Sequence, residues 1–157
     1  MTPEGKVRRD AQILGYAGLL PFAAGALASW IFPAFADAFL SWLLAYGAVI
    51  LSFMGGARWA LAMTSPEARQ RRLFSGLLAA VAPALLAWAM LIPNAILPIP
   101  LAFRLIVLGV GFALLLLDDR AGARAGEGPA WWAPLRTKLT IGVEAALAVA
   151  ALRALTA

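Results

Sequence analysis

The chain has 157 residues, of which 63% are hydrophobic and only 13% charged, whereas a soluble domain is about half apolar and about a quarter charged. So few polar side chains cannot cover a surface in water, which excludes a soluble globular domain, and the apolar content also excludes a disordered chain. The absence of cysteine and histidine excludes disulfides, thiolate catalysis, His-ligated haem and an imidazole base. We therefore predict an integral membrane protein without metal or cofactor.

Uncharged stretches long enough to cross a membrane occur repeatedly along the chain. A helix needs about 20 apolar residues to span the hydrocarbon core. The long uncharged run 73–103 is divided by the proline-rich segment 93–100, because proline breaks helices. The expected spans are 11–31, 38–63, 73–92, 99–117 and 137–155. They predict an all-α fold with a single transmembrane domain over residues 1–157, a compact bundle of five transmembrane helices with a short basic N-terminus at 1–10 and a cytoplasmic loop at 118–136.

The basic residues predict the orientation of this bundle. Ten of the 13 Lys and Arg residues fall on the side of the N-terminus, in segments 1–10, 64–72 and 118–138, whereas the opposite side carries only Arg104 and Arg153. Loops rich in Lys and Arg stay in the cytoplasm, so we expect a cytoplasmic N-terminus and a C-terminus on the other side. If the fifth helix did not cross, the C-terminus would lie inside.

Two alternative interpretations of these segments have less support. A cleaved signal peptide is an alternative for the first span, since Ala34-Phe35-Ala36 is shaped like a cleavage site. Its apolar run is longer than the roughly 7–15 residues usual for a signal core. The basic clusters contact anionic lipid head groups, and the segments that carry them are too short for a nucleic-acid surface with stacking aromatic residues. We expect no nucleic-acid partner.

Two charged residues lie inside the expected spans, Arg58 and Glu144. Both lie roughly 9–10 Å below the inner surface, at 1.5 Å of rise per residue. A carboxylate in hydrocarbon requires a partner. Two interpretations are open: Arg58 pairs with Glu144, or Arg58 extends to the cytoplasmic face and Glu144 bonds a helix-end donor. Gln12 and Tyr16 in the first span lie at the same level and complete this candidate ligand or ion-pair site.

Other polar groups at this level are Ser75 and the adjacent acids Asp118 and Asp119. Neighbouring residues on a regular helix point in different directions, so the two acids cannot both reach one metal ion. We interpret them as the end of the fourth span. No residue pair in the sequence has the character of a nucleophile with its base, and we identify no catalytic residue.

Small, cyclic and aromatic residues predict features of the helices themselves. Gly55 and Gly56 are expected to allow another helix to approach closely. Pro21 and Pro83 are expected to kink their helices. The tryptophans that precede the fifth span, Trp131 and Trp132, are expected to anchor the chain at the membrane interface.

Four segments resemble a domain-of-unknown-function family of small multi-pass membrane proteins found in proteobacteria and mitochondria, which includes mitochondrial transmembrane protein 69. They are LGYAGLLPF (14–22), YGAVILSFMGGARWALA (46–62), PALLAWAML (83–91) and the DDR…PAWWAPLRTKLT stretch (118–140). The glycine pair that leads to Trp59 is the most specific of these motifs. Many members have histidine where this chain has Arg58, so the position needs a polar or cationic group. The resemblance implies location in the bacterial inner membrane and no established activity.

Two classes of function follow. The first is a non-enzymatic accessory or assembly component of an inner-membrane complex, favoured by the scarcity of ionisable groups and by the glycine-rich helix faces. Its partners would be the lipid bilayer and other inner-membrane subunits. The alternative is a small carrier or binding protein for a lipid, a quinone or a proton-coupled solute, which would use the polar site around Arg58 and Glu144.

Overall fold

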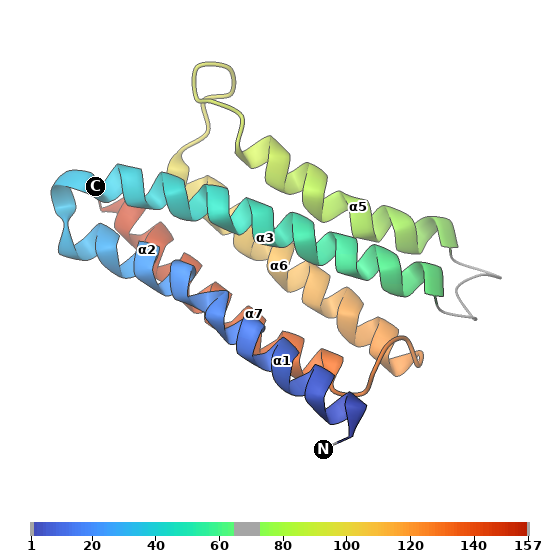
Figure 1. Cartoon of the computed structure of the whole chain (residues 1–157). Coiled ribbons are helices and arrows are strands. Elements are labelled where there is room, and N and C mark those ends of the chain that lie inside the picture. Colours follow the sequence, from blue (N-terminus) through green and yellow to red (C-terminus); the bar gives the residue numbers. More distant parts are fainter. Residues whose placement is uncertain (1, 65–72, 157) are drawn as a thin grey trace.

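The computed structural model describes residues 2–64 and 73–156 as a helical bundle (Figure 1). The elements are α1 (Pro3–Ala17), α2 (Leu19–Ile31), the short 3-10 helix η1 (Pro33–Phe35), α3 (Ala36–Thr64), α5 (Leu73–Met90), α6 (Leu101–Arg124) and α7 (Trp132–Leu155). The described residues contain no strand. The prediction of an all-α fold is therefore confirmed.

The helices are arranged as a ring. In this ring α2 contacts α3, α3 contacts α5, α5 contacts α6, α6 contacts α7, and α7 contacts α2. α3 also contacts α6 across the middle. α1 precedes α2 in the chain and extends along α7. Figure 1 shows the N-terminus at the end of the bundle where α6 passes into α7, which we call the N-terminal end. The C-terminus lies at the opposite end, beside the turn between α2 and α3.

The exterior of the bundle is apolar, as a lipid-facing surface requires. Among the described helices, three are long and apolar enough to cross a membrane, over Glu4–Ile31, Pro33–Met63 and Leu101–Arg124, and Gly76–Met90 is a shorter apolar helix. Many large apolar side chains on these helices are exposed, far more than a monomeric protein shows to water. The chain is therefore a membrane protein.

The core lies between the crossing faces of α2, α3, α6 and α7. Phe22 packs edge-on against both Tyr46 and Phe112, with ring centroids 5.1 and 6.0 Å apart. Leucines of α3 and α6 fill the space around them, including Leu43, Leu51 and Leu108. Because lipid is as apolar as these side chains, close van der Waals packing favours this arrangement more than the hydrophobic effect does.

Several helices extend beyond the spans predicted from hydropathy. The first begins at Pro3, where Gly5 N–H donates to the capping hydroxyl of Thr2 at 3.2 Å. α6 ends at Arg124 instead of residue 117, and α7 begins at Trp132, so the connection expected at 118–136 is reduced to 125–131. The interpretation of Asp118 and Asp119 as a helix end is wrong. Hydropathy marks the edge of the apolar region, whereas backbone hydrogen bonding continues through the charged turns beyond it.

The first helix is interrupted at Gly18, between α1 and α2. Pro21 has no N–H to donate to the carbonyl of Ala17, four residues earlier. The missing hydrogen bond therefore interrupts the helix in the turn that precedes the proline. The hydroxyl of Tyr46 on α3 donates to the carbonyl of Gly18 at 3.0 Å. The second proline, Pro83, lies inside α5, and that helix continues through it.

Arg104, near the start of α6, organises the connection between α5 and α6. Its buried guanidinium donates to the carbonyls of Met90, Ile92, Leu97 and Ile99 and to Asn94 Oδ1, over distances of 2.5–3.0 Å. These acceptors come from the end of α5 and from the proline-rich loop, whose carbonyls have no helical partners. The sequence analysis treated Arg104 only as an orientation charge and missed this role.

The two adjacent glycines of α3 differ in their surroundings. A Cβ added at Gly55 would lie 2.5 Å from the carbonyl oxygen of Ala80, so α3 and α5 approach each other through their backbones at this point. An added Cβ at Gly56 would meet nothing within 4 Å. Close packing therefore applies to Gly55 and not to Gly56.

This difference gives a matched pair of variants. We expect Gly55→Ala to lower the free energy of unfolding by about 1–3 kcal/mol, because the backbone of α5 must move away. Gly56→Ala should leave stability unchanged or slightly higher, since alanine favours helix. Unfolding in mixed micelles with increasing dodecyl sulfate measures both. Equal stabilities for the two variants would contradict the close approach at Gly55.

Candidate functional site

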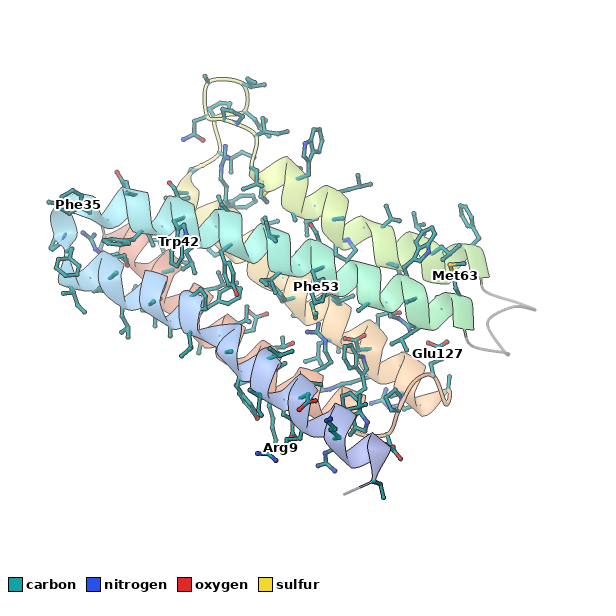
Figure 2. All side chains as sticks on the ribbon, in the orientation of Figure 1. Arg9, Phe35, Trp42, Phe53, Met63 and Glu127 are labelled. Atoms are coloured by element: carbon teal, nitrogen blue, oxygen red, sulfur yellow. The ribbon has the colours of Figure 1, made fainter. Side chains whose placement is uncertain are left out.

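At the N-terminal end of the bundle, Arg58 links α3 to α6 and to the turn that follows α6. Its Nε donates to Asp118 Oδ2 and its Nη1 donates to Glu127 Oε2. The guanidinium lies against the backbone of α6, where a Cβ added at Gly122 would be 2.8 Å from Nη1. Figure 2 shows Glu127 beside the end of α6. Arg58 is thus buried with two carboxylate partners.

The turn after α6 brings Glu127 back to this site. Gly126 has a φ of +80°, and Glu127 N–H donates to the carbonyl of Gly122 at 2.9 Å while Gly126 N–H donates to that of Ala123 at 3.2 Å. This is a Schellman motif, which favours glycine at its left-handed position. The motif reverses the chain so that the side chain of Glu127 faces Arg58.

A second buried ion pair joins α6 to α7. Arg136 Nε donates to Asp119 Oδ2 at 2.8 Å, and both side chains are almost fully buried. Arg136 Nη1 also lies 2.8 Å from the sulfur of Met54 on α3. The adjacent acids Asp118 and Asp119 therefore bind arginines from two different helices.

Of the two interpretations that the sequence left open for Arg58, the pairing with Glu144 is wrong, because Arg58 binds Asp118 and Glu127. Arg58 lies at Gly122 of α6, whereas a Cβ added at Gly109 would be 2.9 Å from Glu144 Oε2. Thirteen residues of helix separate these glycines, which is roughly 20 Å along the axis. The sequence estimate of similar depth failed because the partners of Arg58 lie beyond the apolar part of α6, in turns that were expected to be loop.

Gln12 and Tyr16 are not brought to Arg58. Both lie on α1, whose backbone approaches α2 and α7 but not α3, the helix that carries Arg58. Tyr16 is exposed on the outside of the bundle. Gln12 lines a shallow hollow together with Arg8, Trp131 and other residues at the N-terminal ends of α1 and α7.

In the first half of α7, four residues spaced four apart each carry a buried polar side-chain atom that has no hydrogen-bond partner among the described residues. These atoms are Trp132 Nε1, Arg136 Nη2, Thr140 Oγ1 and Glu144 Oε1. Residues four apart share one face of a helix, so the four side chains form a continuous line, which we call the α7 row. Each unpaired buried polar group costs about 1–3 kcal/mol, so four of them on one face require an explanation.

The first three members of the α7 row line a cavity of about 310 Å³ between α1, α2, α3, α6 and α7. The rest of the wall is mainly apolar and includes Leu19, Phe22, Ile50, Phe112 and Val143. Trp132, predicted as an interface anchor, thus stands in the cavity wall, and Trp131 packs edge-on against it with ring centroids 6.1 Å apart.

The cavity opens sideways between α1 and α3. Leu14 on α1 and Phe53 on α3 both line it, yet these side chains are 73% and 65% exposed. Phe53 is labelled in Figure 2, on α3. The backbones of α1 and α3 do not approach each other closely, which leaves room for the mouth between these two side chains. In a membrane it faces the acyl chains of the lipid.

The signal for this site was present in the sequence as the four-residue spacing of the α7 row. The sequence analysis gave weight only to Glu144 and treated Trp132 as an anchor. Which polar atoms lack partners depends on neighbouring helices and could not be predicted from spacing. In the described part of the chain, no group of three or more acidic residues could hold a metal ion.

These features define a helical membrane protein with a lateral cavity. The chain belongs to the family described as "Protein of unknown function (DUF3429)", whose model matches residues 7–152, and the resemblance found in the sequence is confirmed. Transmembrane protein 69 of Xenopus tropicalis is 34% identical over 134 residues, which cover 85% of this chain and 50% of that protein. The chain thus spans half the length of this relative. No solved structure matches.

Double-mutant cycles test the ion-pair assignment. We expect Arg58→Gln and Asp118→Asn to couple by roughly 0.5–3 kcal/mol in the free energy of unfolding, as contacting residues do. Arg58→Gln and Glu144→Gln should be additive within about 0.5 kcal/mol, because they lie far apart along α6. Coupling in the second cycle and additivity in the first would contradict the structure.

Proposed function

We propose that this protein binds a lipophilic molecule in the cavity beside the α7 row, and that it does so without catalysing a reaction. The observation that carries this proposal is that three residues lining one wall of an otherwise apolar cavity, Trp132, Arg136 and Thr140, each carry a buried polar atom without a partner. Ligand sites are typically apolar with a few converging polar groups, and their volumes begin at about 300 Å³. A bound molecule would supply the missing hydrogen bonds.

The charged groups near the cavity support binding rather than catalysis. Arg58 binds both Asp118 and Glu127, and Asp119 binds Arg136. An enzyme needs a nucleophile or a base within reach of its substrate. In the described residues, these carboxylates are already hydrogen-bonded to arginines, which favours a structural role for them.

An accessory or assembly role in a membrane complex is a second candidate. The observation that favours it is the outer face of α5, where Phe74, Leu78, Leu85 and Trp88 are all more than half exposed and share one side of the helix. This face would accept another transmembrane subunit in place of lipid. The two roles are compatible, because a subunit of a complex can also hold a lipid.

We further propose five transmembrane crossings in the bacterial inner membrane, with the N-terminus in the cytoplasm. The support is the distribution of charge, since segments 3–10 and 125–138 lie at the N-terminal end of the bundle. Arg9 extends away from the helices there (Figure 2). Basic segments of this kind remain on the cytoplasmic side.

Blocking the cavity tests the proposed function. We expect protein purified in mild detergent to carry a lipophilic molecule at near one per chain, identified by mass spectrometry of the extract. Ala11→Phe places a ring in the cavity wall and should remove at least about nine-tenths of that molecule, given the lost space. Ala17→Phe on the exposed side of α1 is the matched control and should retain it. Equal retention by both variants, or no bound molecule in the parent, would overturn the proposal.

The natural absence of cysteine gives a clean background for testing the orientation. A single cysteine at Thr2 should react with a membrane-impermeant maleimide only after the inner membrane is opened. A cysteine at Thr156, at the opposite end of the bundle, should react from the periplasm in intact spheroplasts. The reverse labelling pattern would show that the orientation is inverted. If both cysteines or neither reacted from outside, the two ends would lie on the same side of the membrane, and the number of crossings would be even.

A further inference from the structure

We propose that the ligand has an uncharged head group with carbonyl oxygens, of the kind found in quinones, and that it enters from the lipid between α1 and α3. The head group would accept hydrogen bonds from Trp132 Nε1, Arg136 Nη2 and Thr140 Oγ1. This inference rests on the proposed function and adds the chemical class of the ligand, its partners and its route of entry.

The unpaired atoms specify acceptors on the ligand. The indole N–H of Trp132 and the guanidinium of Arg136 can only donate, and the hydroxyl of Thr140 can donate as well as accept. Arg136 and Thr140 are only 4% and 2% exposed, so their unpaired atoms point into the protein and not into solvent. A ligand oxygen beside them would pair donors that have no other partner among the described residues.

The charge of the cavity indicates an uncharged head group. Arg136 is the only charged residue among the described residues that line the cavity, and Asp119 compensates it from α6 at 2.8 Å. On α3, Arg58 is already paired with Asp118 and Glu127.

The lining residues of α1 and α2 are uncharged. Glu144, the next member of the α7 row, can add only negative charge. A phosphate or carboxylate would therefore enter without a compensating charge, which is costly in an apolar site. A carbonyl oxygen satisfies the same donors without that cost.

The mouth of the cavity suits a molecule that arrives from the bilayer. Leu14 and Phe53 on its two sides are apolar and exposed to the region that lipid fills. The volume of about 310 Å³ lies at the lower end of the range for ligand sites. It therefore holds the head group and the first part of a tail, and the remainder of a long tail extends through the mouth into the acyl chains.

The test compares three probes with similar apolar chains on the full-length protein in phosphatidylcholine nanodiscs. Decylubiquinone carries an uncharged carbonyl head group, whereas laurate and dodecyl phosphate are anions. Binding is measured by the rise in Tm and by quenching of tryptophan fluorescence. We expect the quinone to bind at least about tenfold more tightly than either anion, because each uncompensated buried charge adds to the cost of binding.

Two threonines on α7 provide matched variants. Thr140→Val removes the cavity hydroxyl while keeping the shape of the side chain, and should raise the Kd of the quinone about 3- to 10-fold, as the loss of one hydrogen bond does. Thr137 lies one turn earlier and does not line the cavity, and its hydroxyl donates to the carbonyl of Ala133 at 2.9 Å. Thr137→Val should leave the Kd unchanged, and the Tm of both free variants verifies their folding.

The outcomes separate this inference from the proposed function. Quinone binding that Ala11→Phe abolishes and Thr140→Val weakens supports the inference. Tighter binding of an anion that Ala11→Phe also abolishes, or a co-purified molecule without an uncharged carbonyl head group, overturns the inference and leaves the proposed function intact. Equal Kd values for the parent and Thr140→Val overturn the assignment of the donors. If no probe binds and no molecule co-purifies, both proposals are wrong.

Discussion

Two ion pairs at neighbouring positions of α6 fix the arrangement on which the rest of the molecule depends. Asp118 binds Arg58 from α3, and Asp119 binds Arg136 from α7. Adjacent residues on a helix point about 100° apart, so one short acidic segment holds two different helices in register. Charged side chains inside a membrane protein are costly, and pairing of this kind lowers that cost. Separating either helix from α6 would leave a carboxylate or a guanidinium without its partner.

The position of the cavity follows from these pairs. Once Asp119 holds Arg136, the face of α7 that contains Trp132, Thr140 and Glu144 must turn toward the interior of the bundle. The break at Gly18 lets α1 diverge from α3 while α2 packs against it. The space left between them is lined by the polar face of α7 on one side and by apolar side chains on the other. The ion pair between Asp119 and Arg136 thus helps to place the proposed binding site.

The opposite end of the bundle satisfies its polar groups by backbone contacts. Arg104 gathers the carbonyls of the loop after α5, and Arg153 donates to the carbonyl of Ser29 at 3.1 Å while lying over the ring of Trp30. The indole of Trp30 in turn donates to the carbonyl of Val149 at 3.3 Å. At both ends, the buried arginines of the described residues, Arg58, Arg104 and Arg136, have acceptors from neighbouring helices or loops. In the α7 row, by contrast, each side chain keeps one buried polar atom that has no partner among the described residues.

The sequence by itself determined that this is an all-α membrane protein, because composition and the length of apolar runs report directly on the solvent. The resemblance of four of its segments to known members pointed to its family. The sequence also identified Arg58, Glu144 and Gly55 as unusual positions. The tertiary structure decided the partners, since Arg58 binds Asp118 and Glu127 and lies far from Glu144 along α6. It also decided where the helices end and which polar atoms of α7 stay unpaired. These properties depend on how helices distant in sequence approach one another, and a helical pattern specifies which face is polar but not which neighbour that face will meet.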